Sequence, residues 1–183
     1  MEGLIAGTPL NTIAREMTEA SNIGMKRALL ITRTEILRAH RIATLYGYQQ
    51  SGVVVKYKRI ANKRTACMAC LLLDGEIFNV ASSFTDHPNG ACAMIPIVEG
   101  VKAPSWLYGK DYFMGLDSEE QRARMGNTYY EMWQDKVFKL EDLPFYRRNN
   151  VWGDSPAIQP IWMLQGYKSY ADKLQQLHQQ MHE

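Results

Sequence analysis

Residues 67–92 read CMACLLLDGEIFNVASSFTDHPNGAC and hold all three cysteines of the 183-residue chain. Cys67 and Cys70 form a C-x2-C pair, and His87 and Cys92 follow after a gap. Zinc prefers thiolate and imidazole ligands, and a close cysteine pair with a distant second pair can complete a tetrahedron around the ion. The spacing therefore predicts a metal centre made by Cys67, Cys70, His87 and Cys92.

The predicted role of this metal is structural. Four protein ligands leave no coordination position for a water molecule, which argues against metal-assisted hydrolysis. Because the ligands come from two segments, metal binding contributes to the free energy of folding. The contribution is roughly 10 to 16 kcal/mol in small zinc modules. Sulfur and nitrogen ligands favour Zn2+ as the cofactor, with iron as the alternative.

Three other readings of the cysteines stay open. A C-x2-C pair can be a redox couple, but the thioredoxin type begins a helix, whereas Leu71–Leu73 predict a strand. A disulfide would leave one thiol over, and the first ten residues show no signal-peptide pattern. The third reading is a cluster of cysteines without a ligand. The metal interpretation is preferred because His87 and Cys92 complete the ligand set.

Composition predicts a globular α+β protein. With 46% hydrophobic and 10% aromatic residues, the chain can bury a sizeable core. We expect a single domain over residues 1–183, helical over 1–50, a metal-clamped β region over 51–100 and helical again over 101–183. The formal net charge of +2 implies no general nucleic-acid surface. No apolar run approaches the roughly eighteen residues of a membrane span.

Two helices are predicted in the first fifty residues. Thr8-Pro9 offers an N-cap followed by proline at the first helical position, and apolar residues recur at helical spacing from Leu10 to Met17. The same spacing predicts a longer helix from about Met25 to Tyr46, with Gly47 as its end.

A small antiparallel sheet is predicted next. Residues 53–60 are rich in β-branched and aromatic side chains and alternate from Val55 onward, as a half-buried strand does. Leu71–Leu73 and Glu76–Phe78 flank Asp74-Gly75, a turn sequence typical of a hairpin. Met94–Val98 predicts an edge strand, because its proline cannot donate to a central ladder. The metal would clamp the hairpin to the loop at 87–92.

Helices are predicted again in the C-terminal part. Asp117 and Glu120 resemble a capping box, and Gly126 a helix stop. Ser155-Pro156 is expected to begin a further helical turn, and residues 170–183 a polar tail. Four tryptophans are expected in the core, namely Trp106, Trp133, Trp152 and Trp162.

Several short motifs carry a resemblance to a known family. They are Arg33-Thr34-Glu35, Arg64-Thr65 before the cysteine pair, Leu73-Asp74-Gly75, His87-Pro88-Asn89 before Cys92, Tyr130-x-x-Trp133 and Leu140-x-Asp142-Leu143. In this order they resemble the Mu F-like head-morphogenesis family of tailed phages. Members commonly close the motif with His-Pro-Asn-Cys-Arg-Cys, whereas Gly90-Ala91 intervene here.

The resemblance implies a minor head protein, a structural component of the virion and not an enzyme. Such a protein is incorporated at or near the portal during capsid assembly, with portal and capsid proteins as partners. It implies a location in the virion head, and in the host cytoplasm during assembly. Contact with packaged double-stranded DNA, without sequence preference, would use a local basic patch made by Lys56, Lys58, Arg59, Lys63 and Arg64. The structural alternative for this patch is the exposed face of a strand.

Two other functions remain open. Related domains occur in toxins, so the alternative is a toxin-like nuclease or transferase domain, in which Asp86-His87 could serve acid–base chemistry and Arg33 with Glu35 could hold an anion. The sequence contains no nucleophile elbow, phosphate loop or glycine-rich cofactor turn. A zinc-stabilised adaptor unrelated to phage would differ from the head protein only in its partner.

Overall fold

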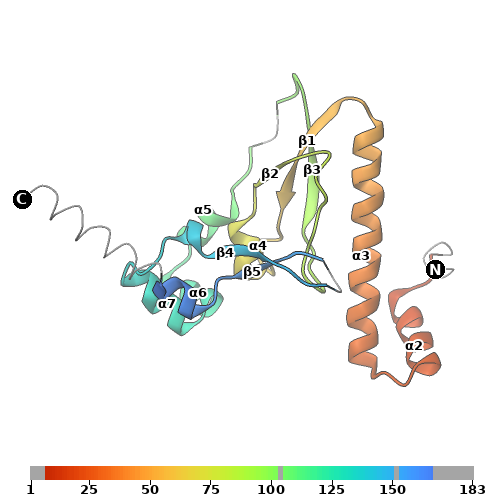
Figure 1. Ribbon diagram of the computed structural model, residues 1–183, viewed down its shortest axis with the longest axis horizontal. Coiled ribbons are helices and arrows are strands. Elements are labelled where there is room, and N and C mark those ends of the chain that lie inside the picture. The colour runs from red at the N-terminus through yellow and green to blue at the C-terminus, as the bar shows by residue number, and fades with distance from the viewer. Residues whose placement is uncertain (1–6, 103–104, 151–152, 167–183) are drawn as a thin grey trace, which may run out of the picture.

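The computed structural model describes residues 7–102, 105–150 and 153–166. Over these residues the chain is a mixture of helices and antiparallel sheet, so the predicted α+β class is confirmed. Figure 1 shows the order in space: the N-terminal helices stand on one side, a small sheet lies beside them, and the C-terminal elements gather on the far side of the sheet.

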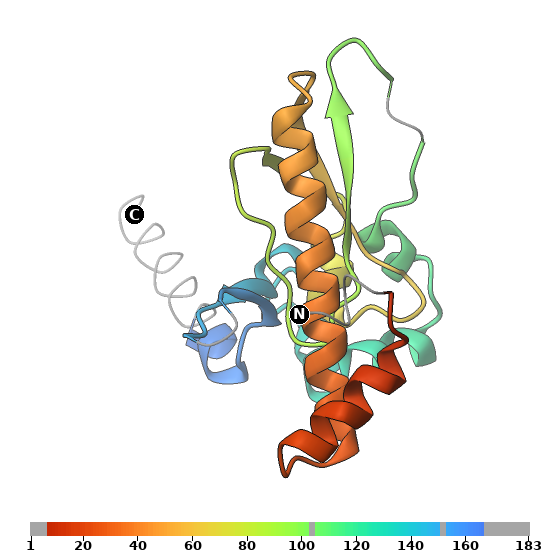
Figure 2. The same cartoon turned by 90° about the vertical axis from the view of Figure 1, so that its right-hand side faces the viewer.

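The N-terminal part is a helical hairpin of α2 (Leu10–Ala20) and α3 (Met25–Gln50). Both views place α2 against one end of α3 (Figures 1 and 2), and buried Ala14 and Ala28 let the two helices approach closely. The predicted end of the long helix at Gly47 is wrong, because α3 continues to Gln50. Tertiary bonds hold this last turn: Tyr48 Oη donates to the carbonyl oxygen of Met94, and Gln49 Nε2 donates to that of Val80.

The sheet has three antiparallel strands in the order β2-β1-β3. The strand β1 (Val54–Ile60) is central, with β2 (Ile77–Asn79) and β3 (Ala93–Val98) on either side. The predicted edge position of the strand that contains Pro96 is confirmed, since β3 is an outer strand. Tyr57 of β1 is fully buried, and its ring stacks on Phe78 at a centroid distance of 5.3 Å.

The predicted hairpin over residues 71–78 is wrong. Residues Met68–Leu72 form a short helix, α4, and β2 pairs with β1 instead. A short apolar run fits a strand or a buried helical turn equally well, and here packing decides. Met68 and Leu71 enter the main core, which is possible only when they lie one helical turn apart.

The main core lies between α4 and the C-terminal elements. These are α5 (Gly109–Met114), α6 (Ser118–Met125), α7 (Asn127–Gln134), the 3-10 turn η1 (Leu140–Asp142), β4 (Pro144–Arg147) and β5 (Ser155–Ile158). The Asp117 side chain accepts from the Glu120 amide, as the predicted cap requires. The buried core residues are Met68, Leu71, Phe113, Met125, Tyr130, Phe138, Leu140, Leu143 and Leu164.

Two predictions for the C-terminal part are wrong. Ser155-Pro156 opens strand β5, which pairs with β4, so this part is not purely helical. Trp106 and Trp162 are 38% and 69% exposed and therefore do not belong to the core, whereas Trp133 packs against it. Trp152 and the segment 170–183 lie outside the described residues. Among the residues the structure describes, no helix combines the length and apolar character needed to cross a bilayer.

Candidate metal centre

The four predicted ligands lie around one point between α4 and the loop that precedes β3. Cys67 precedes the first turn of α4, Cys70 lies within it, and the loop brings His87 and Cys92 back to them. Two overlapping groups have all their ligand atoms within 4.8 Å of one another, Cys67 with Cys70 and His87, and Cys70 with Asp86 and Cys92. Cys70 is common to both groups, so the structure brings all four predicted side chains together.

One pair of donor atoms has the spacing of two zinc ligands. Bond lengths of about 2.3 Å to sulfur and about 2.0 Å to nitrogen, at tetrahedral angles, separate the two ligand atoms by about 3.5 Å. Cys67 Sγ and His87 Nε2 are 3.3 Å apart. The second ring nitrogen, His87 Nδ1, lies 3.0 Å from the carbonyl oxygen of Pro88, the kind of contact that orients a ligating imidazole.

The helical start of α4 bears on the redox alternative. A redox pair was disfavoured because a strand was predicted after Cys70. That prediction is wrong, because both cysteines lie at the start of a helix. The preference for a metal now depends on the approach of His87 and Cys92, which a two-cysteine redox couple does not need.

Hydrogen bonds among the cysteines and His87 shift the pKa values of all four side chains. Bonds from Cys70, and then from His87, lower the pKa of Cys67 to about 4, while the contact with Cys67 raises the pKa of His87 to about 9. A bond from Cys70 and the charge of Arg59 lower the pKa of Cys92. The pKa of Cys70 is raised because it donates to both neighbours and is buried. The lowered pKa values of Cys67 and Cys92 favour the thiolate form, whereas the raised pKa values of Cys70 and His87 mean that both would have to lose a proton when a metal binds.

A buried carboxylate lies directly behind the ligands. The Asp86 side chain is 1% exposed and forms ion pairs with Arg41 Nη2 at 2.8 Å and Arg59 Nη2 at 3.0 Å. It also accepts from the backbone amides of His87 and Cys92, at 3.0 and 3.1 Å. Asp86 therefore fixes both ends of the ligand loop. Because its oxygens already accept from two guanidinium groups and two backbone amides, the acid–base role considered for Asp86-His87 is excluded for this carboxylate.

Arg59 connects this carboxylate to the metal ligands. Its side chain is 1% exposed, and its Nη2 lies 3.6 Å from Cys70 Sγ. Arg59 was predicted to belong to a DNA-binding patch, but the alternation of β1 places it on the same face as Tyr57, which is the buried face. The alternation was the signal that identifies Arg59 as an interior residue.

Hydrogen bonds hold the long helix α3 against the ligand loop. Arg41 donates to the carbonyl oxygens of Cys92, at 2.9 Å, and Gly90, at 2.6 Å. Thr34, two turns away on the same face, accepts from the Asn89 amide at 2.9 Å. Arg41 could not be identified as a functional residue from the sequence, because nothing in its spacing separates it from the other basic residues of the helix.

Gly90 allows the loop to close over Asp86. A Cβ atom at this position would lie 2.4 Å from the carboxyl carbon of Asp86, closer than any real contact. The loop therefore requires glycine at the position where the resembled family carries a cysteine.

The five residues of the predicted basic patch do not form one surface. Lys56 and Arg64 are exposed, whereas Arg59 is buried against Asp86. Lys58 Nζ donates to Tyr108 Oη at 2.8 Å. Lys63 Nζ lies 3.2 Å from a carboxylate oxygen of Asp74. Arg59 is therefore unable to contact DNA in this fold.

Comparisons with known proteins give one match. The chain is 26% identical, over 163 residues, to NAD(+)--arginine ADP-ribosyltransferase EFV of Enterococcus faecalis. The match covers 78% of this chain and therefore includes the central region with the cysteines, but the chain spans 31% of the length of that relative. No model of a protein family matches the chain, and no solved structure does.

This match corrects one expectation. Sequence analysis expected a chain that is not an enzyme, and that expectation is overturned because the matched protein is named as a transferase. The alternative of a toxin-like transferase domain is better supported than the head protein. The resemblance to the Mu F-like family stays a prediction.

Proposed function

We propose that this chain is a toxin-like transferase domain related to ADP-ribosyltransferases and built around a structural zinc. The observation that carries the proposal is the match to the Enterococcus faecalis transferase, which extends through the region of the metal centre. The name of that protein gives the reaction to test: transfer of ADP-ribose from NAD+ to an arginine side chain.

In this proposal the zinc supports the fold and takes no part in transfer. Bound to Cys67, Cys70, His87 and Cys92, the ion would crosslink α4 and the ligand loop, and four protein ligands leave it no open position. Asp86 accepts from two arginines and two backbone amides, so it is a positioning residue for the loop. The reacting groups of a transferase would therefore lie outside this cluster.

The test uses the purified zinc-loaded chain and NAD+ labelled in its ADP-ribose part. We expect label to enter an arginine-rich acceptor peptide and not a lysine-rich peptide of the same length and charge. A chain unfolded by chelation is the control for a contaminating activity. Label that stays entirely in NAD+, with a chain shown to be folded and metal-loaded, would overturn the transferase proposal.

A second candidate, the phage minor head protein, is supported by a specific observation. The cysteine–histidine motif, which is part of the resemblance to the Mu F-like family, comes together in the structure. This candidate predicts capture of portal or capsid proteins by the tagged chain, and recovery of the chain from purified virions. The absence of both from infected or induced cells would remove it.

A further inference from the structure

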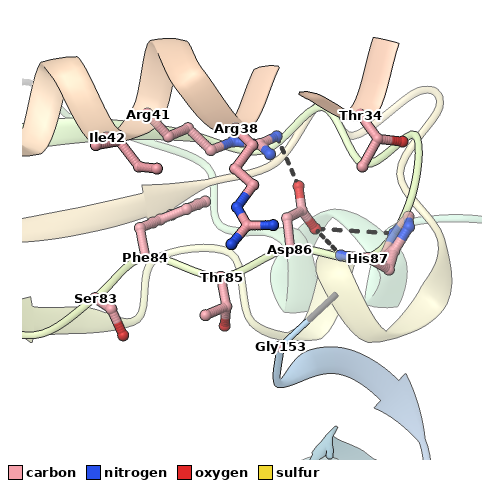
Figure 3. Close-up of a pocket in the computed structure, with 10 residues that line it drawn as sticks. All are labelled: Thr34, Arg38, Arg41, Ile42, Ser83, Phe84, Thr85, Asp86, His87 and Gly153. Carbon is pink, nitrogen blue, oxygen red and sulfur yellow. Dashed lines mark hydrogen bonds and ion pairs between the residues drawn. The ribbon is translucent and has the colours of Figure 1, made fainter. Parts of the chain in front are cut away.

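A cavity of about 290 Å³ has Asp86 and His87 in its wall and no cysteine among its lining residues. Its walls are one face of α3, with Arg38, Arg41 and Ile42, and the segment Ser83–His87 (Figure 3). Taking about 30 Å³ for each water molecule, the volume corresponds to roughly ten waters. That is the lower end of the range for ligand sites, which indicates a small ligand.

Positive charge exceeds negative charge around this cavity. Arg41 and Arg59 share the single carboxylate of Asp86. Arg38 lies one turn before Arg41 on the same helix face, and Figure 3 shows its guanidinium reaching across the cavity toward Thr85 with no dashed contact to the other residues drawn. Burial lowers the pKa of Arg41, an effect that Asp86 opposes.

Among the described residues the acidic partner of Arg38 is Glu35, and their ion pair is weak. Glu35 Oε1 lies 4.0 Å from Arg38 Nη1, and the two side chains are 46% and 52% exposed. Ion pairs of this exposed kind contribute little, typically well under about 1 kcal/mol. Arg38 is thus available to a ligand that enters the cavity, at little cost in broken contacts.

Hydroxyl groups on the opposite wall add hydrogen-bonding capacity. Ser83 and Thr85 line the cavity, and neither hydroxyl has a hydrogen-bond partner among the described residues. Figure 3 shows both hydroxyl oxygens pointing away from the Arg38 guanidinium, so each would have to turn about its Cα–Cβ bond to donate toward a ligand there. A guanidinium fork together with hydroxyl donors matches the oxygens of a phosphate group.

We propose that this cavity binds the phosphate group of a small molecule, with Arg38 as the principal ligand-binding side chain. The phosphate would lie between Arg38 and the hydroxyls of Ser83 and Thr85, and Ile42, which is 60% exposed, would contact the organic part. Asp86 closes the cavity toward the metal centre, so the same carboxylate shapes both sites. The site does not depend on transferase activity, and either proposal can fail alone.

The test titrates inorganic phosphate, ribose 5-phosphate and NAD+ into the zinc-loaded chain at constant ionic strength, with chloride as the reference anion. Backbone amide shifts of residues 83–87 report binding at the cavity. Arg38→Gln is compared with Arg27→Gln, which removes the same charge from an exposed position of the same helix. The paired Ser83→Ala and Thr85→Ala change removes the hydroxyls without altering charge.

We expect inorganic phosphate and ribose 5-phosphate to compete for one site, with affinity weakened at least tenfold by Arg38→Gln and unchanged by Arg27→Gln. Competition by NAD+ would identify a dinucleotide as the phosphate source, and its absence a monoester. Lack of saturable binding, or equal weakening by both arginine variants, would overturn the proposal. So would duplex DNA binding that needs Arg38 when the small phosphates do not bind.

Discussion

Replacing Asp86 with asparagine should destabilise the protein strongly, since it removes one negative charge from between two buried guanidinium groups. The substitution keeps the size of the side chain, so packing around it is largely retained. Arg41 Nη2 at 2.8 Å and Arg59 Nη2 at 3.0 Å each lose a charged partner. Breaking a buried ion pair from one side costs about 3 to 5 kcal/mol, because the remaining charge stays buried.

The expected loss is a large share of the stability of a domain, typically about 5 to 15 kcal/mol. Urea unfolding followed by tryptophan fluorescence measures it. With a slope of about 2 to 3 kcal/mol per molar urea, the midpoint should fall by roughly 1 to 2 M. The exposed Asp135→Asn serves as the matched control and should change stability by less than about 0.5 kcal/mol.

The same variant tests whether Asp86 supports the metal centre. Because its carboxylate accepts from the amides of His87 and Cys92, its loss should loosen both ligands and weaken zinc binding at least tenfold, as loss of an outer-shell partner does. An Asp86→Asn protein with unchanged zinc affinity and a free energy of unfolding within about 1 kcal/mol of the parent would refute this reasoning.

Three further predictions concern the surroundings of the centre. Gly90→Ala places a Cβ 2.4 Å from the Asp86 carboxyl carbon and should weaken zinc binding in competition with a chelator, whereas Gly47→Ala, which meets nothing, should leave zinc binding unchanged. Gly109→Ala places a Cβ 1.9 Å from the carbonyl oxygen of Leu71 and should lower the melting temperature sharply, by about 2 kcal/mol or more in free energy. Acidification should release the zinc, because thiolate and imidazole bind metal only after losing protons; release followed with a zinc dye should rise as pH falls, and zinc retained at pH 3 would contradict four such ligands.

The elements predicted correctly are those whose sequence signals are local. The cap at Asp117 and the edge position of β3 each follow from the backbone chemistry of one or two residues. The predicted start of α2 is one residue off, because Pro9 and not Thr8 is the N-cap and Leu10 is the first helical residue. The convergence of the four metal ligands followed from their spacing, since a close cysteine pair needs two distant partners.

The errors occur where tertiary contacts override local preference. Leu71–Leu73 has no periodicity that separates a strand from a helical turn. The helical turn forms because it lets Leu71 pack against core residues that are distant in sequence. Gly47 has a weak preference against helix, and contacts of Tyr48 with the sheet outweigh it. Ser155-Pro156 could begin a helix in isolation, but pairing with β4 extends it.

The buried ion pairs of Asp86 could not be predicted from the sequence, for a different reason. Arg41, Arg59 and Asp86 come from a helix, a strand and a loop, so no sequence spacing relates them. The alternation of β1 was sufficient to place Arg59 inside, but only the folded loop identifies its partner. The expectation that the chain is not an enzyme was wrong, since the absence of familiar catalytic motifs does not exclude an enzyme.

Metal analysis of the purified chain tests the central claim most directly. Elemental mass spectrometry should find one zinc per chain, lost in Cys70→Ser and His87→Ala together with a large fall in melting temperature. Zinc near zero in the parent chain, with a cooperative melting transition that neither substitution shifts, would contradict a metal centre and leave the fold held by its core and by Asp86 alone.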